Sequence, residues 1–316
     1  MALDVGRLRV LVEVAHAGSI AAAARRMGFS PSALSQQLAK LERQVGARLL
    51  ERGAGGVTPT ATGQVLVEHG ERVLGELREA ERAVATAGTA GAATVTIALG
   101  TFATGGTLLV PAALAALRRD HPQVRLALRD VEPPDGYGLV ASGDLDVLIT
   151  HRYPGMPSTP VRGLVRRNLL LDPLRVVVPT AWADEVTHPL DDASWVCGPP
   201  GSPSRVCLEH LARAAGTASP RVDLETADYA LTLALVRDGL GVALVPASVL
   251  AGSPVDGVAV RDVAGTPPVR EICVVHRRRP PPPAQRLIDL VQQAAVRLAA
   301  RLAAGSGAGE RDLTGG

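Results

Sequence analysis

The apolar positions of the segment 30–52 follow the period of a helix with one buried face. They recur at spacings of four, three and four, at Leu34, Leu38, Leu41 and Val45. Ser30 can cap this predicted helix, and Pro31 fits its first turn. At about 100° per residue, the opposite face carries short polar side chains and positive charge: Ser32, Gln36, Lys40 and Arg43, with Ser35 at the margin. A plain solvated face would more often mix glutamates with lysines, so this pattern favours contact with nucleic acid.

Two shorter helices are predicted ahead of this one, over residues 4–17 and 20–27. Gly18 ends the first helix, and Gly28 begins the turn after the second. Helix, turn and capped helix in this order form the helix-turn-helix arrangement. The glycines and the proline of the segment 49–60 then predict a loop or a small wing.

Residues 62–87 predict one long helix with a narrow apolar stripe. The stripe alternates by four and three, as in a coiled-coil seam: Leu66, Val73, Leu77 and Val84, with Gly70 and Ala80 in the same register. We expect this seam to pair two chains, although it is too short to hold a dimer alone. A flexible joint is expected over residues 88–93.

After the joint, strand-like and helix-like segments alternate, which is typical of a parallel α/β fold. The first unit runs from the strand at 94–100 to the strand at 146–150, and a proline-rich break at 151–160 follows it. The second unit is predicted to contain strands at 164–172, 174–179, 221–225 and 241–246, a strand near Trp195, and helices near 205–215 and 229–238. A strand at 269–276 and an amphipathic helix over 284–303 lead into a glycine-rich tail.

Composition and charge narrow the class of protein. Apolar residues make up 47% of the 316 residues, which indicates a globular chain. The net charge is only +2, but residues 1–62 carry eight basic and four acidic side chains, so we expect this head to bind a polyanion. Three cysteines without paired spacing argue against a disulfide framework or a zinc site and for a reducing cytoplasm. No apolar run reaches the roughly 18 residues of a membrane span, and no signal-peptide pattern begins the chain, so a cytoplasmic protein is expected.

The head, the seam helix and the two-part body together resemble the LysR-type transcriptional regulators. The stretches that carry the resemblance are AAAARRMGFSPSALSQQLAKLERQVGARLLER at 21–52, VTPTATG at 57–63, LLLDPLRVVVP at 169–179, HPL at 188–190 and ALVRDGLGVALVP at 234–246. Leu50 stands where the family usually has phenylalanine, and it keeps the position apolar. The resemblance implies an α/β protein with an all-α winged helix-turn-helix head and a two-lobed, periplasmic-binding-protein-like effector domain.

The resemblance also implies how the chain is divided. The expected parts are a DNA-binding domain at 1–62, a linker helix for dimerisation at 63–90, an effector-binding domain at 91–303 and a disordered tail at 304–316. Lobe I of the effector domain would comprise 92–161 and 268–303, and lobe II would comprise 162–267. Homodimers or homotetramers are implied, joined through the seam Leu66, Val73, Leu77 and Val84.

Double-stranded DNA is the partner that the resemblance implies for the head, with the third helix in the major groove and the wing on the backbone. The candidates for base contacts are Pro31, Ser32, Ser35 and Gln36, and Gln36 can pair bidentately with adenine. The candidates for backbone contacts are Lys40, Arg43, Arg48, Arg52 and Thr58. A solvated surface side chain is the alternative for each of them.

A small-molecule effector is expected between the lobes, because ligands of open α/β folds lie at strand ends beside helix N-termini. Helix dipoles favour negative charge there, so an anionic effector is expected. The candidate contacts are Thr101, Phe102, Ala103, Thr104, Thr150, His151, Ser202, Ser204 and Thr226. An ordinary helix cap is the alternative for Ser204, and a hinge residue is the alternative for His151.

Other functional classes find little support in the sequence. GLGVAL at 239–244 lacks the third glycine of a dinucleotide loop, and there is no GxSxG elbow or metal cluster. We therefore expect no enzyme, no catalytic residue, no cofactor and no metal. A redox-sensing regulator that uses Cys197 and Cys207 remains an alternative, because some family members sense peroxide through two cysteines in this region. A solute-binding protein without a DNA role is another alternative, but it would not need the basic head.

Overall fold

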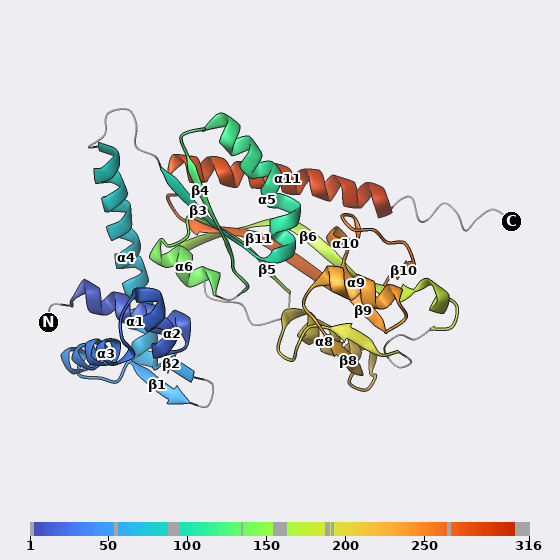
Figure 1. The fold of residues 1–316 in the computed structure, drawn as a ribbon, viewed down its shortest axis with the longest axis horizontal. Helices are drawn as coiled ribbons and strands as arrows, with labels where there is room; N and C mark the ends of the chain where they lie inside the picture. The colour runs from blue at the N-terminus through green and yellow to red at the C-terminus, as the bar shows by residue number, and fades with distance from the viewer. Residues whose placement is uncertain are drawn as a thin grey trace.

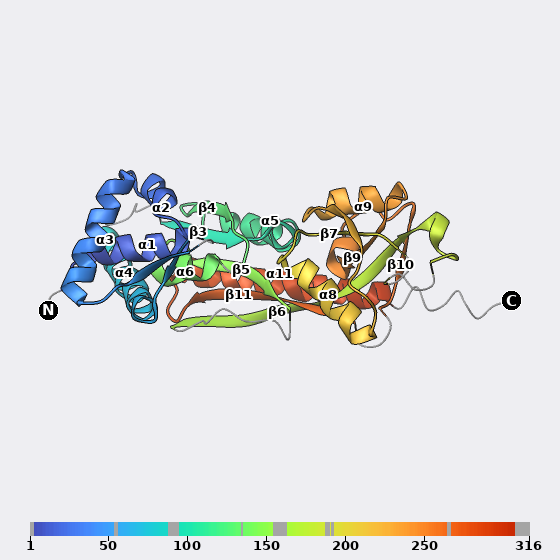
Figure 2. The ribbon, with the colours of Figure 1, turned by 90° about the horizontal axis from the view of Figure 1, so that it is seen from below.

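The molecule is elongated, with a helical head at one end and two α/β lobes beyond it (Figures 1 and 2). This computed structural model describes residues 3–53, 56–87, 95–133, 135–153, 163–186, 190, 193–263 and 267–306. Several predicted features lie outside the described residues: the joint over 88–93, most of the proline-rich break, the first two residues of the HPL stretch, and the tail from 307 onward.

The head has the predicted helices and a two-stranded wing. The elements are α1 (Val5–Ala17), α2 (Ile20–Met27), α3 (Pro31–Val45), β1 (Leu50–Gly53) and β2 (Gly56–Pro59). Each helix starts with a side-chain cap, from Asp4, Ser19 and Ser30 respectively. Each also ends at a glycine in the left-handed region, where a side chain would be strained. Leu34, Leu38 and Leu41 are buried, which confirms the apolar face predicted for α3.

The long helix α4 (Ala61–Ala87) leaves the head along α1. Val67 and Leu74 are buried in the head core, and Leu66 packs partly against the same core. Farther along the helix, Val73, Leu77 and Val84 are 43%, 45% and 73% exposed. The outer part of the predicted seam is therefore accessible, whereas its first residue contributes to the head.

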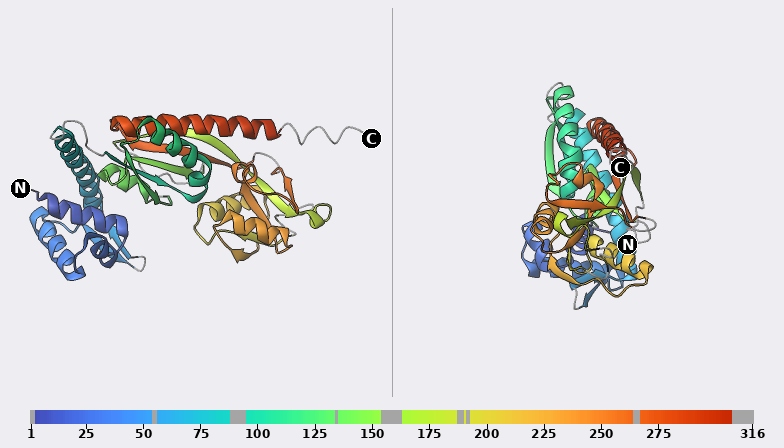
Figure 3. Two further views of the ribbon diagram at one scale, coloured as in Figure 1. Left: turned by 45° about the horizontal axis from the view of Figure 1, so that its top comes forward. Right: turned by 90° about the vertical axis from the view of Figure 1, so that its right-hand side faces the viewer.

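The sheet of lobe I is mixed rather than parallel. Its strands are β4 (Arg125–Asp130), β3 (Thr96–Thr101), β5 (Val147–Arg152), β11 (Val269–Arg277) and the first part of β6 (Leu164–Pro179), in that order. β11 runs antiparallel between β5 and β6. Helices α5 (Ala103–Asp120) and α11 (Pro282–Ser306) cover one face in a continuous apolar core, and the short helix α6 (Gly136–Ser142) covers the other (Figure 3).

Strand β6 passes from one lobe into the other, which differs from the sequence expectation. Two strands were predicted, with the lobe boundary at residue 162, but β6 is one strand of 16 residues. Residues 164–173 pair with β11 in lobe I, and residues 174–179 pair with β9 (Val242–Pro246) and β10 (Val258–Arg261) in lobe II. Pro173 lacks an N–H group, yet it does not end the strand because the pairing partners change at this point.

Lobe II is built on a second sheet with the strand order β6-β9-β7-β8. Its remaining elements are the 3-10 turn η1 (Thr180–Trp182), β7 (Trp195–Cys197), α8 (Pro203–Ala215), β8 (Val222–Glu225), α9 (Tyr229–Arg237) and α10 (Ala247–Leu250). Strands β7, β8 and β9 are parallel, as predicted, and β6 is antiparallel to β9. The carboxyl ends of β7 and β8 lead to the starts of α8 and α9, and Tyr229 at the start of α9 lies near Tyr153 and Arg270 at the crossing between the lobes.

Candidate DNA-binding surface and inter-lobe site

Helix α3 presents its predicted polar face to solvent. Pro31, Ser32, Gln36, Lys40 and Arg43 are exposed, and Ser35 is half-buried. Within the described part of the chain, the side chains of Gln36, Lys40 and Arg43 have no hydrogen-bond or ion-pair partner. Their polar groups are therefore not committed to the fold of the head.

The wing carries three more of the predicted contacts, and it is fixed to the head. Arg48 precedes the hairpin, Arg52 pairs with Val57 across it, and Thr58 pairs with Glu51. All three predicted contacts are exposed. The backbone N–H of Val57 donates to the carbonyl of Gly18 at 2.8 Å, which ties the wing to the turn between α1 and α2.

A buried ion pair stands where β6 and β11 cross between the lobes. Arg270 Nη2 lies 2.7 Å from Asp172 Oδ2, and the two side chains are 2% and 0% exposed. Arg270 also donates to Thr104 of α5 at 3.0 Å and to Ser248 of α10 at 3.3 Å. Burial is the largest influence and opposes the charge, but Asp172, Tyr229 and Tyr153 together raise the pKa of Arg270. The guanidinium is thus a permanent cation that joins both lobes.

Aromatic side chains surround this guanidinium. The ring centroids of Phe102 and His151 are 4.5 Å apart, and those of His151 and Tyr153 are 5.8 Å apart, edge to face. The Arg270 Cζ atom lies 5.4 Å from the Phe102 ring centroid. The side chains of Tyr153 and Tyr229 lie close to each other, so the end of β5 meets the start of α9. Aromatic contacts therefore continue from lobe I into lobe II.

His151 is neutral in this environment. Burial, reinforced by the nearby charge of Arg270, lowers the pKa of His151 to about 3. Its Nδ1 atom is buried and has no hydrogen-bond partner among the described residues. The imidazole therefore offers an unused polar group beside the crossing.

The lobe I candidates for effector contact lie at or next to this network. Thr101 and Thr150 are buried at 4% and 2% exposure, and the Thr101 hydroxyl donates to the carbonyl of Phe102. Ala103 is exposed at the start of α5, and the carboxyl group of Glu132 lies near its backbone N–H. An acidic side chain therefore already occupies the N-terminus of α5.

The lobe II candidates are largely engaged in capping. Ser202 accepts from the N–H of Arg205 at 3.3 Å as the cap of α8, and its hydroxyl lies 3.3 Å from that of Ser204. Thr226 accepts from the N–H of Asp228, whose carboxylate caps α9. Ser204 is therefore not the cap of α8, which corrects the alternative considered for it.

Sequence reasoning missed Asp172, Arg270, Tyr153 and Tyr229. Asp172 and Arg270 are 98 residues apart, so no local spacing connects them. A signal was nonetheless present, because Arg270 and Glu271 precede the apolar run 272–275 and Asp172 precedes a proline between two apolar runs. Charges in such positions are usually paired.

The cysteines do not have the environment of a redox sensor. Cys197 and Cys207 are free and buried. Burial raises the pKa of Cys207 to about 12 and also raises the pKa of Cys197 above its usual range. Both remain protonated thiols at neutral pH, and the thiolate is the reactive form.

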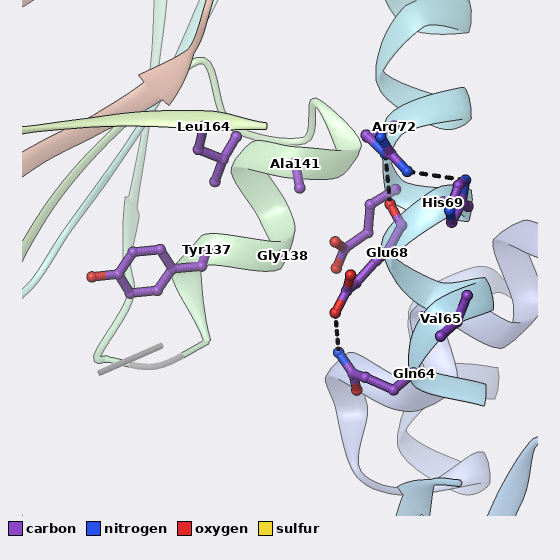
Figure 4. A pocket seen from close by; sticks show the side chains of 10 residues that line it. Gln64, Val65, Glu68, His69, Arg72, Tyr137, Gly138, Ala141 and Leu164 are labelled. Carbon is purple, nitrogen blue, oxygen red and sulfur yellow. Dashed lines mark hydrogen bonds between the residues drawn. The ribbon is translucent and has the colours of Figure 1, made fainter. Parts of the chain in front are cut away.

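The linker helix α4 contacts lobe I through α6, and Figure 4 shows the pocket that lies between the two helices. Arg78 of α4 forms an ion pair with Asp144 at 2.7 Å and donates to the carbonyl of Ser142. The two helices approach closely, since a Cβ atom at Gly75 would lie 2.8 Å from the carbonyl oxygen of Ala141. Beside this contact is a cavity of about 250 Å³, whose lining includes Gln64, Glu68, Arg72, Gly138 and Leu164.

Among the described residues, no group of three or more His, Cys, Asp and Glu side chains is arranged to hold a metal ion. In the same part of the chain, no helix is both long enough and apolar enough to span a membrane.

Comparison with known proteins agrees with this geometry. Residues 5–64 match the bacterial regulatory helix-turn-helix family of lysR type, and residues 90–296 match the LysR substrate binding domain. The HTH-type transcriptional regulator CbbR of Xanthobacter flavus is 31% identical, over 95% of this chain and 91% of its own length.

Solved structures share the fold. Full-length CbnR complexed with its target DNA is 24% identical with a TM-score of 0.51, covering 92% of this chain and 100% of its own. Full-length LysG from Corynebacterium glutamicum with bound effector Arg is 20% identical with a TM-score of 0.56, covering 93% and 99%. The chain belongs to the LysR-type transcriptional regulators: it is a DNA-binding regulator with an effector-binding domain, and not an enzyme.

Proposed function

We propose that this regulator binds a partly palindromic operator as a homodimer or homotetramer, and that a small anionic effector bound between the lobes controls it. The observation that carries the proposal is the meeting of both lobes at one buried guanidinium. Arg270 contacts Thr104 of lobe I, Ser248 of lobe II and Asp172 on the strand that joins them. A ligand at this crossing would touch both lobes and could therefore favour one of their arrangements.

The polar face of α3 is proposed to read the bases, and the wing is proposed to contact phosphates. Gln36→Ala should cost about 1 to 3 kcal/mol at one position of each half-site, because a bidentate contact to adenine is lost. Arg52→Ala, the matched control on the wing, should weaken binding to all sequences alike and flatten the salt dependence. Fluorescence anisotropy with operator and random duplexes measures both effects. Equal losses on the two duplexes for Gln36→Ala would remove its base-reading role.

The start of α8 is the proposed position for the negative charge of the effector. Carboxylates already occupy the starts of the neighbouring helices, Glu132 at α5 and Asp228 at α9. Helix α8 begins with Ser202, a neutral cap, and Ser204 lies beside it. The positive end of its dipole therefore has no acidic group of its own to offset it.

Thr101→Val and Ser204→Ala test this site. Each removes one hydroxyl, and Ser204→Ala spares the cap of α8, whereas Ser202→Ala would cost about 1 kcal/mol of helix stability. Both variants should bind operator normally and need about tenfold more effector to respond. The effector is first found by thermal-shift screening of small carboxylates, and DNA binding is then titrated with it. Wild-type responses from both variants would place the effector elsewhere.

A further inference from the structure

His16 lies where the head, the linker helix and lobe I meet. Its Nε2 atom is 2.7 Å from Oε1 of Glu71 on α4, and the two side chains are 14% and 17% exposed. Its other ring nitrogen, Nδ1, is buried. The imidazole is therefore enclosed, and one short hydrogen bond fixes its orientation.

Lobe I reaches the same imidazole through a glycine of α6. A Cβ atom at Gly138 would overlap the ring of His16, whose Nε2, Cε1 and Cδ2 atoms would be its nearest neighbours, with Cδ2 at 2.7 Å. The backbone of α6 thus packs directly against the imidazole. Only a residue without a side chain permits this approach.

Helix α6 is fixed to lobe I rather than to the head. Tyr137 is buried in one cluster with Leu148 of β5 and Val275 of β11. A Cβ atom at Gly136 would lie 2.6 Å from the Leu148 side chain, so the start of α6 lies close against the sheet. A displacement of this sheet relative to the head would therefore press on His16 or release it.

On the side of the head, His16 is close to the attachment of the wing. It lies in the last turn of α1, and Gly18 ends that helix. The carbonyl of Gly18 accepts from the N–H of Val57 at 2.8 Å, and a Cβ atom at Gly56 would lie 2.5 Å from the same oxygen. A shift of His16 would move the end of α1 and, with it, strand β2 of the wing.

We infer that His16 is a positioning residue through which lobe I sets the place of the wing. The inference rests on the proposed contact of the wing with DNA phosphates and adds a route by which the effector domain alters that contact. A histidine that served the head alone would need only Glu71 and the dipole of α1. The packing of Gly138 against the ring adds lobe I to this contact.

Three variants of the full-length protein test the inference: Gly138→Ala, His16→Ala and the double variant. The methyl group of Gly138→Ala changes lobe I only, yet it should make exchange of the Val57 amide about tenfold faster. Affinity for a random-sequence DNA duplex should fall about threefold to tenfold, with a flatter salt dependence, because a phosphate contact is lost. Hydrogen-exchange NMR and fluorescence anisotropy measure the two effects.

The double variant separates coupling from a folding defect. Removal of the His16 ring leaves room for the new methyl group, so Gly138→Ala should have no further effect in the His16→Ala background. His69→Ala is the control, because it removes an exposed histidine from the same linker helix. It should leave amide exchange and DNA affinity unchanged.

Two results would overturn the inference. Additive effects of the two changes, in exchange or in melting temperature, would mean that the methyl group disturbs lobe I without acting through His16. A larger radius of gyration in Gly138→Ala with unchanged Val57 exchange would mean that the head moves as a rigid body. The role of the wing on DNA is decided separately by Arg52→Ala, and Val57 exchange tests the positioning role whatever Arg52→Ala shows.

Discussion

His151 shows how burial beside a cation fixes the state of a single residue. Its folded pKa of about 3 lies well below its ordinary value of 6.5, because burial and then Arg270 disfavour the imidazolium. Between these values the unfolded chain binds a proton that the folded chain does not. Acidification through this window should therefore lower stability, by up to about 1.4 kcal/mol per pH unit from this residue.

His151→Gln removes this titration and keeps a polar side chain, so its stability should fall less steeply on acidification. Urea unfolding of both proteins at intervals from about pH 7 to pH 4 measures the difference. His276 also has a lowered pKa, but it titrates in both proteins and cancels in the comparison. Parallel stability curves would show that His151 does not titrate in this way.

At the scale of elements, α4 has one face in the head and one face in solvent. Leu77 is 45% exposed on the stripe that Val73 and Val84 continue. Leu77→Asp places two charges in the seam of a dimer and should weaken self-association by several kcal/mol. DNA affinity should fall with it, because two half-sites are read together.

Sedimentation equilibrium and operator binding check the Leu77→Asp prediction. Val65→Asp is the matched control: it puts the same charge at a 58% exposed valine of the same helix, about 100° from the stripe. Oligomer size and DNA affinity should stay unchanged in the control. The same result in Leu77→Asp would take the seam out of the mechanism.

Local signals were sufficient for the helices of the head and insufficient for the crossing between the lobes. The caps Ser19 and Ser30 and the stripe of α3 act within a few residues, so the sequence predicts them well. Pro173 suggested a break between two strands. The strand continues because its pairing partner changes from β11 to β9 at this point. These partners lie some 70 to 100 positions away in the chain, so no local signal reveals the change. The Arg270 network joins residues from four separate elements, and a single sequence shows no periodicity that would reveal it.

At the scale of the whole molecule, strand β11 extends from the inter-lobe network to the helix that contacts the head. Arg270 near one end joins the lobes, and Arg277 at the other end donates to the carbonyl of Val140 in α6 and pairs with Asp146 at 3.2 Å. Helix α6 in turn contacts α4 through Arg78. A change at the crossing would therefore reach the linker helix through β11 and α6. This route requires that close packing between α4 and α6 fixes their relative position.

Gly75→Ala tests whether this packing is rigid, because the added methyl group has two opposite effects on the stability of the protein. In an isolated helix the change should stabilise α4 by about 1 kcal/mol. Against α6 the new Cβ atom would lie 2.8 Å from the carbonyl oxygen of Ala141, which is backbone and cannot rotate away. We therefore expect α4 to move off α6, with a larger radius of gyration in X-ray scattering and faster hydrogen exchange in α6.

Glu76→Ala, an exposed neighbour on the same helix, should leave both measurements unchanged. Unchanged scattering and exchange in Gly75→Ala, with a raised melting temperature, would mean that the helix contact adapts to the methyl group and does not fix the head.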